Sequence, residues 1–146
     1  ELVRQYSDND IDAVMQIWLD TNIQAHHFIP SDYWRTNCNM VREMLPHAEI
    51  YVHEDDCTKQ IDGFIGLNDD YIEGVFVKET MQSKGIGKQL LNHAKEFRSK
   101  LKLSVYQEND NFIYVRNWHT LCQSIPYKFV QASRCLKLQI SANKTA

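Results

Sequence analysis

The hydrophobic positions of the chain follow two different periods, and each period predicts its own kind of element. Apolar residues that alternate with polar ones are typical of a half-buried strand, and apolar residues that recur every three or four positions are typical of a helix. The first period, together with short apolar runs, predicts strands at 2–6, 49–53, 61–67, 71–77, 101–107, 127–130 and 136–140. Residues 110–126 have no clear period.

Three other segments carry the helical period. The first follows the capping residues Ser7–Asp10 and has the apolar face Ile11, Val14, Met15, Trp18 and Leu19. The second is expected to be capped by Ser31 and ended by Pro46, with the stripe Trp34, Cys38, Val41 and Leu45. The third has the stripe Ile86, Leu90, Ala94 and Phe97, with Leu91 beside it. Between Asn22 and Pro30 the pattern breaks, which predicts a loop.

The spacing of the strands predicts how they pair. The three strands between residues 49 and 77 are separated by short polar turns, which favours an antiparallel meander. Gly63 and Gly66 allow close packing or a bulge within the second of them. The strand, helix and strand between residues 71 and 107 favour a parallel pair.

Composition limits the kinds of protein that this chain can be. Its 146 residues are 43% hydrophobic and 24% charged, which is ordinary for one globular domain over 1–146. No apolar run approaches the ~20 residues of a membrane span, and no signal peptide is expected. The four cysteines have no C-x-x-C spacing, so we expect reduced thiols, a cytoplasmic location and no metal site.

The segment that joins the strand at 71–77 to the third helix predicts a phosphate site. It contains Gln82, Ser83, Lys84, Gly85, Ile86, Gly87 and Lys88. Glycines let a phosphate approach the backbone, and the free N–H groups at a helix start attract anions. The Walker pattern fails because Gln82 and Gln89 stand where Gly and Ser or Thr are needed, and the dinucleotide pattern fails at Leu90.

The charge around this segment indicates a small polyanion. Residues 82–102 contain six basic residues and one acidic residue, in a chain whose formal net charge is −3. A long nucleic acid needs a broad basic surface, so no nucleic-acid partner is expected.

The pattern Gln-x-x-Gly-x-Gly after a strand resembles the acetyl-CoA loop of the GNAT acetyltransferase superfamily. Three further stretches resemble small bacterial lysine acetyltransferases of the YiaC type, namely 25–29 with 33–34, then 74–77 and 105–109. The resemblance covers about 2–109 and leaves 110–146 atypical. It implies an α/β fold in which helices flank a mixed, mostly antiparallel sheet with two splayed strands.

The resemblance also implies a site. Acetyl-CoA would bind Gln82 to Lys88, the backbone of Phe76 and Val77, and Asn109, and an amine acceptor would meet His26, His27, Phe28 and Tyr33. Glu73 is the candidate general base and Tyr114 the candidate general acid. The family's Phe-Tyr motif after Asn109 is altered here: one register supplies Tyr114 about two residues early, and a second, which aligns Phe129 and Val130, supplies no acid.

Two functions follow from this resemblance. The first is an N-acetyltransferase that transfers acetyl from acetyl-CoA to a primary amine of a protein lysine, a peptide or a small molecule by direct attack. The alternative is a CoA-binding sensor or interaction module with weakened catalysis. Either could be a monomer or a homodimer.

Overall fold

The computed structural model describes residues 2–25, 29–98, 100–106, 127–132 and 135–141. Its helices are α1 (Ile11–Ala25), α2 (Ser31–Met44) and α3 (Ile86–Phe97). Its strands are β1 (Val3–Gln5), β2 (Glu49–Glu54), β3 (Ile61–Asn68), β4 (Tyr71–Val77), β5 (Lys100–Tyr106), β6 (Tyr127–Ala132) and β7 (Cys135–Ser141). The predicted order of strands and helices is confirmed.

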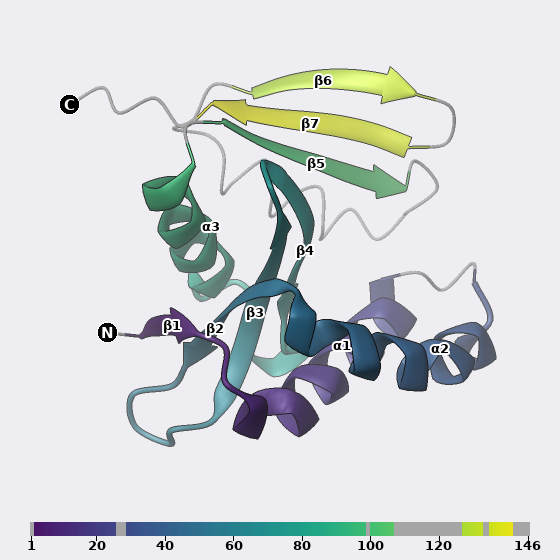
Figure 1. The fold of residues 1–146 in the computed structure, drawn as a ribbon, viewed down its shortest axis with the longest axis vertical. Coiled ribbons are helices and arrows are strands. Elements are labelled where there is room, and N and C mark those ends of the chain that lie inside the picture. The colour runs from purple at the N-terminus through teal and green to yellow at the C-terminus, as the bar shows by residue number, and fades with distance from the viewer. Residues whose placement is uncertain (1, 26–28, 99, 107–126, 133–134, 142–146) are drawn as a thin grey trace.

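The strands form one sheet in the order β1-β2-β3-β4-β5-β7-β6. Only β4 and β5 pair in parallel, and the other neighbours are antiparallel, so the predicted mixed sheet with its meander and its parallel pair is confirmed. The parallel pair covers only two positions, Tyr71 with Lys102 and Ile72 with Leu103. Beyond Ile72 the two strands diverge, and Figure 1 shows β5, β7 and β6 turning away from β1 to β4.

Two apolar clusters fix the helices on the sheet. On one face, Leu90, Leu91 and Ala94 of α3 pack with Ile65 and Ile72 of the central strands. On the other face, a cluster from α1 and the strands includes Val14, Ile17, Val52 and Phe64, and Trp18, Cys38 and Val41 pack against it. The helices therefore lie on opposite faces of the central strands, as Figure 1 shows.

The helix boundaries confirm one predicted cap and correct another. Ser7 forms a capping box with Asp10 ahead of α1. Ser31, in contrast, is the first residue of α2, where Pro30 holds the capping position without a side-chain hydrogen bond. The N–H of Tyr33 donates to the Pro30 carbonyl at 3.0 Å, so the chain is already turning at Pro30 and the prediction for Ser31 was wrong.

Two apolar patterns end differently from the prediction. Helix α1 continues to Ala25, because the buried side chains of Thr21 and Asn22 donate to the carbonyls of Ile17 and Trp18 in its own preceding turn. Phe97 was expected on the buried stripe of α3 but is 54% exposed. Its ring is stacked on Tyr51 of β2 with the ring centroids 5.7 Å apart, so it covers that ring and does not enter the core.

Both expectations for the glycines of β3 are confirmed. A Cβ on Gly63 would lie 3.0 Å from the Phe76 carbonyl oxygen and 3.1 Å from Cγ2 of Ile86, so β3, β4 and α3 meet closely there. At Gly66 the register between β3 and β4 shifts, which marks a bulge.

Candidate active site

The segment between β4 and α3 forms a turn that ends at a helix N-terminus. A short 3-10 turn, Glu79–Met81, follows β4, and Gly85 is the N-cap of α3 with φ +86°. The carbonyl of Gly85 accepts the N–H of Gln89 at 3.1 Å and so begins the helix. Ser83 also has a positive φ, +65°, so two residues of this short segment adopt the left-handed backbone conformation.

This turn presents backbone donors to an open space. Within the described part of the chain, the N–H groups of residues 86–88 find no acceptor, as expected in the first turn of a helix. A Cβ built on Gly85 would have nothing within 4 Å. The neighbouring Lys84 and Lys88 are exposed. Free donors, the helix dipole and two lysines fit the diphosphate of CoA.

Gln82 belongs to the loop that the sequence predicts, and its side chain points back to the strand. Its Nε2 donates to the carbonyl of Val77 at 3.0 Å. The side chain is half-buried and closes the loop onto the end of β4. The glutamine of the Gln-x-x-Gly-x-Gly pattern therefore fixes the shape of the turn.

The divergence of β4 from β5 leaves part of the β4 backbone facing a gap. The N–H of Lys78 donates to the Asp62 carbonyl at 2.9 Å, and Val77 is paired with Gly63 one position before. Backbone groups alternate in direction along an antiparallel strand, so the N–H of Val77 points away from β3, toward the side where β5 diverges. The backbone groups of Phe76 face β3 by the same alternation.

Two side chains of β4, the candidate catalytic base Glu73 and the aromatic Phe76, occupy defined positions. Glu73 is exposed and lies next to Gly66, where the two strands shift register. The ring of Phe76 stacks on Phe64 with centroids 4.6 Å apart. It lies over Gly74, where an added Cβ would come within 2.4 Å of the ring. Gly74 is therefore needed to seat this ring at the end of β4.

Several predicted site residues lie outside the described residues. These are the candidate acid Tyr114, the candidate CoA contact Asn109 and the candidate acceptor contacts His26, His27 and Phe28. The remaining predicted acceptor contact, Tyr33, is 54% exposed at the start of α2 and meets the ring of Trp34 edge-on at 5.1 Å.

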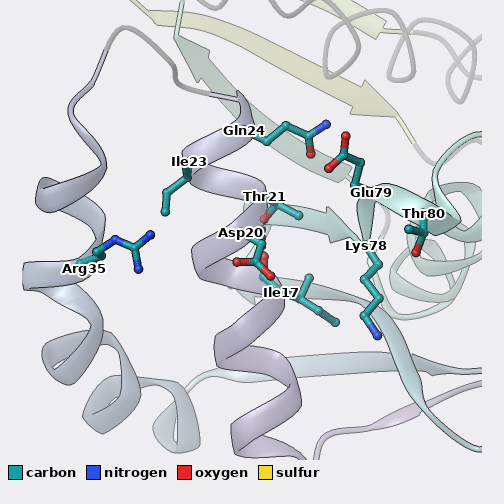
Figure 2. A pocket seen from close by; sticks show the side chains of 9 residues that line it. All are labelled: Ile17, Asp20, Thr21, Ile23, Gln24, Arg35, Lys78, Glu79 and Thr80. Carbon is teal, nitrogen blue, oxygen red and sulfur yellow. Dashed lines mark hydrogen bonds between the residues drawn. The ribbon is translucent and has the colours of Figure 1, made fainter.

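A cleft of about 490 Å³ opens beside the end of β4, and no pattern in the sequence predicts it. Figure 2 shows side chains of α1 facing the segment that follows β4, with Gln24 opposite Glu79, while Arg35 reaches over from α2. The lining residues are Ile17, Asp20, Thr21, Ile23, Gln24, Arg35, Lys78, Glu79 and Thr80. They come from three distant segments, so only the fold brings them together.

Comparison with known proteins identifies the family. The family model described as "Acetyltransferase (GNAT) domain" matches residues 46–121, just over half of the chain. This chain belongs to the GNAT acetyltransferase family. The match includes residues 82–88, the phosphate loop, and the diverging strands β4 and β5, so the GNAT resemblance predicted from the sequence is confirmed.

Two curated relatives of this GNAT acetyltransferase come from Escherichia coli. Peptidyl-lysine N-acetyltransferase YiaC is 28% identical over 123 residues, which are 81% of this chain and 83% of the relative. Peptidyl-lysine N-acetyltransferase YjaB is 22% identical over 111 residues, 76% of this chain and 75% of the relative.

Solved structures show the same fold. The solution structure of apo YjaB from E. coli has a TM-score of 0.75 at 19% identity and covers 96% of this chain and 95% of its own. The PaiA N-acetyltransferase of Thermoplasma acidophilum, solved in complex with coenzyme A, has a TM-score of 0.78 at 14% identity and covers 95% and 97% of the two chains. Among the described residues of the GNAT chain, no helix is both long and apolar enough to cross a membrane.

Proposed function

We propose that this GNAT acetyltransferase transfers the acetyl group of acetyl-CoA to the side-chain amine of a lysine in a peptide or protein. The observation that carries the proposal is the open helix start at Gly85 beside the gap where β4 leaves β5. If the diphosphate of acetyl-CoA bound at this helix start and its pantetheine arm lay in the gap, the thioester would reach the end of β4. The lysine acceptor is supported by the names of YiaC and YjaB.

The reaction needs an oxyanion donor, a base and an acid, and the chain offers a candidate for each of these three roles. The lysine nitrogen attacks the thioester carbon, and the carbonyl electrons form an oxyanion. The N–H of Val77, which faces the gap, would hold that oxyanion. Before this attack, Glu73, through water, would take the proton that the lysine ammonium must lose to become a nucleophile. When the carbon–sulfur bond breaks, Tyr114 would protonate the CoA thiolate, and the second proton that the nitrogen loses as the amide forms would restore the Tyr114 hydroxyl.

The cleft beside β4 supports an amine acceptor. Lys78 follows Val77 directly, so the cleft opens next to the proposed oxyanion donor. The apolar side chains of Ile17 and Ile23 suit the methylene stem of a lysine. The carboxylates of Asp20 and Glu79 would pair with its ammonium, although the basic Arg35 and Lys78 also line the cleft and leave it without a net negative charge. We propose that His26, His27, Phe28 and Tyr33 continue this acceptor wall.

The deciding experiment measures CoA thiol release from acetyl-CoA with three acceptors: a lysine peptide, the same peptide with its lysine acetylated, and a polyamine. We expect release and a mass increase of one acetyl group only with the free lysine peptide. If CoA binds but no acceptor releases thiol above the rate of hydrolysis, the chain is a CoA-binding module. If the polyamine is preferred, the lysine assignment is wrong.

The role of Tyr114 can be tested by Tyr114→Phe, which deletes one hydroxyl. Because general acid catalysis contributes roughly 10²-fold or more, we expect kcat to fall by about that factor. The KM for acetyl-CoA should change little, since the hydroxyl acts only as the thiolate leaves. Full activity in this variant would favour the register in which no tyrosine acid is supplied.

A further inference from the structure

A chain of three polar side chains lies beneath the phosphate loop. Nδ1 of His53 on β2 lies 2.6 Å from Oδ1 of Asp62 on β3. Nε2 of His53 lies 3.1 Å from Oε1 of Gln89 on α3. His53 and Asp62 are only 4% and 3% exposed, so this network of polar side chains crosses an otherwise apolar interior.

A bulge aims Asp62 into this position. The register pairs His53 with Gly63 and the next residue, Glu54, with Ile61, so Asp62 is one extra residue in β3. Without the bulge, Asp62 would share the face of Phe64, because side chains two positions apart point to the same side. The extra residue frees Asp62 to meet His53 on the face that α3 covers.

Asp62 and the next residue, Gly63, make contacts at both ends of the phosphate loop. The Asp62 carbonyl accepts the N–H of Lys78, where the loop leaves β4. Its carboxylate acts through His53 on Gln89, whose own N–H bonds to the Gly85 carbonyl at the start of α3. Gly63, the next residue, packs against the side chain of Ile86 in the same first turn.

Stability alone does not account for this arrangement. Oδ2 of Asp62 is buried and has no hydrogen-bond partner among the described residues. A buried polar group without a partner is unfavourable, and an apolar pair of similar volume would fill the space at no such cost. The network therefore destabilises the interior in part while it holds Gln89 in place.

Hydrogen-bond counting shows that Gln89 is held in either charge state of the histidine. As an imidazolium, His53 donates to Asp62 from one nitrogen and to Oε1 of Gln89 from the other. As a neutral ring, it donates to Asp62, and the amide of Gln89 turned by 180° donates to Nε2. In both cases the first turn of α3 is bonded to β2 through the ring.

We propose that His53, Asp62 and Gln89 are positioning residues that hold the first turn of α3 so that its N–H groups converge on the diphosphate of acetyl-CoA. The inference rests on the proposed function, because it takes this turn to be the acetyl-CoA site. None of the three residues needs to touch the ligand. They act through the backbone of residues 85–88.

The test replaces Gln89 by methionine, which keeps the side-chain length and helix propensity but removes both polar atoms. Without the bond to His53, we expect the Kd for CoA, by calorimetry, and the KM for acetyl-CoA to rise about tenfold, equivalent to ~1.4 kcal/mol. The kcat and the KM for the acceptor should stay within about twofold, because the variant disturbs only the first turn of α3. Asn92→Ala, which removes an exposed amide from the same helix, is the matched control and should change neither constant.

A second variant separates positioning from packing. Asp62→Leu keeps the volume of the side chain and leaves the backbone bond from Lys78 in place, while removing the acceptor that orients the His53 ring. It should raise the KM for acetyl-CoA in the same way, with a melting temperature within a few degrees of the wild type.

The outcomes are distinct. Unchanged CoA affinity in folded Gln89→Met would overturn the inference, as would a fall in kcat at constant KM. If both variants melt earlier but bind CoA normally, the network is only structural. If the wild-type chain does not bind CoA, the proposed function fails first and the inference falls with it.

Discussion

At the scale of single residues, the phosphate loop contains one side chain in an unfavourable backbone region. Ser83 has φ +65°, in the left-handed region that glycine adopts without strain. A residue with a Cβ is less stable there by roughly 1 kcal/mol. The loop therefore holds Ser83 in place against its own preference, which indicates that the contacts around it determine its shape.

Ser83→Gly should stabilise the protein. The variant removes the strain from the folded state, but glycine also has more conformational entropy in the unfolded state. The expected net gain in the free energy of unfolding is therefore about 0.5 kcal/mol. Urea denaturation measures it. Ser83→Ala, which keeps the Cβ, is the control and should give no gain. A loss of stability in the glycine variant would show that the Ser83 side chain makes a stabilising contact.

Gly85 allows a second prediction at this scale. Gly85→Glu would put a strained, negatively charged side chain into the open space before α3, so the CoA affinity should fall at least tenfold, ~1.4 kcal/mol. Gly87→Glu should act in the same direction through its charge. Calorimetric titration measures both variants. The control is Asn92→Glu, which adds the same charge on an exposed turn of α3. Wild-type affinity in folded Gly85→Glu would exclude this turn as the diphosphate site.

At the scale of elements, the start of α1 is fixed by a carboxylate that both caps the helix and binds an arginine. Asp10 accepts the Ser7 N–H at 2.9 Å and two bonds from the Arg4 guanidinium, at 2.8 and 2.9 Å. The Arg4 bonds lower the pKa of the Asp10 carboxyl against the opposing effect of burial, and the Ser7 bond lowers it further. This junction joins β1 to the helix that lines the cleft.

Asp10→Asn should show a stability difference that depends on pH. A carboxyl whose pKa is lower in the folded state stabilises the fold above its unfolded pKa of ~3.9, and this stabilisation is lost as the pH falls through the folded pKa. The variant should thus lose ~1–3 kcal/mol at neutral pH, the range for bonds to a charged group. The difference from the wild type should shrink in acid.

Urea denaturation from neutral to acidic pH measures this difference. Asp8→Asn removes an exposed carboxylate from the same turn and serves as the control, with an expected effect within ~0.5 kcal/mol. A deficit for Asp10→Asn that stayed constant into acid would mean that the cap geometry, and not the charge, supplies the stability.

At the scale of the whole molecule, the charge around the proposed CoA site differs from the charge around the proposed acceptor cleft. Residues 82–102 carry six basic residues and one acidic residue, although the chain as a whole has a net charge of −3. The phosphate end of CoA would therefore meet the basic region of an acidic protein. The cleft beside β4 is balanced between the acidic Asp20 and Glu79 and the basic Arg35 and Lys78.

Binding of CoA should consequently weaken with salt. Between ~0.05 and ~0.5 M NaCl the Debye length falls from about 14 Å to about 4 Å, so we expect the affinity to drop several-fold. Pantetheine, which has no phosphate, should compete with acetyl-CoA with an inhibition constant that hardly changes over the same range. Equal salt dependence for both compounds would argue against a basic diphosphate site.

The local sequence was sufficient to predict most elements and the phosphate loop. A strand such as β2 or β3 buries one face when every second residue is apolar, and α3 does so when every third or fourth residue is apolar. Both periods can therefore be recognised in short segments. The loop was recognisable because a diphosphate needs a flexible glycine, here Gly85, directly before a helix. Two boundaries were wrong. At Ser31 the chain already turns at Pro30, and at Asn22 the side chains bond to carbonyls of α1, which the apolar pattern does not record.

The tertiary structure decided what lies beneath and beside that loop. His53 and Asp62 come from different strands, and only a bulge in the pairing turns Asp62 toward the histidine. An aspartate inside the apolar run of β3 was a visible signal, but its partner was not. The cleft needs α1, α2 and the segment after β4 together. Periodicity records which side of an element is buried, whereas these contacts depend on register and on which distant element packs against that side.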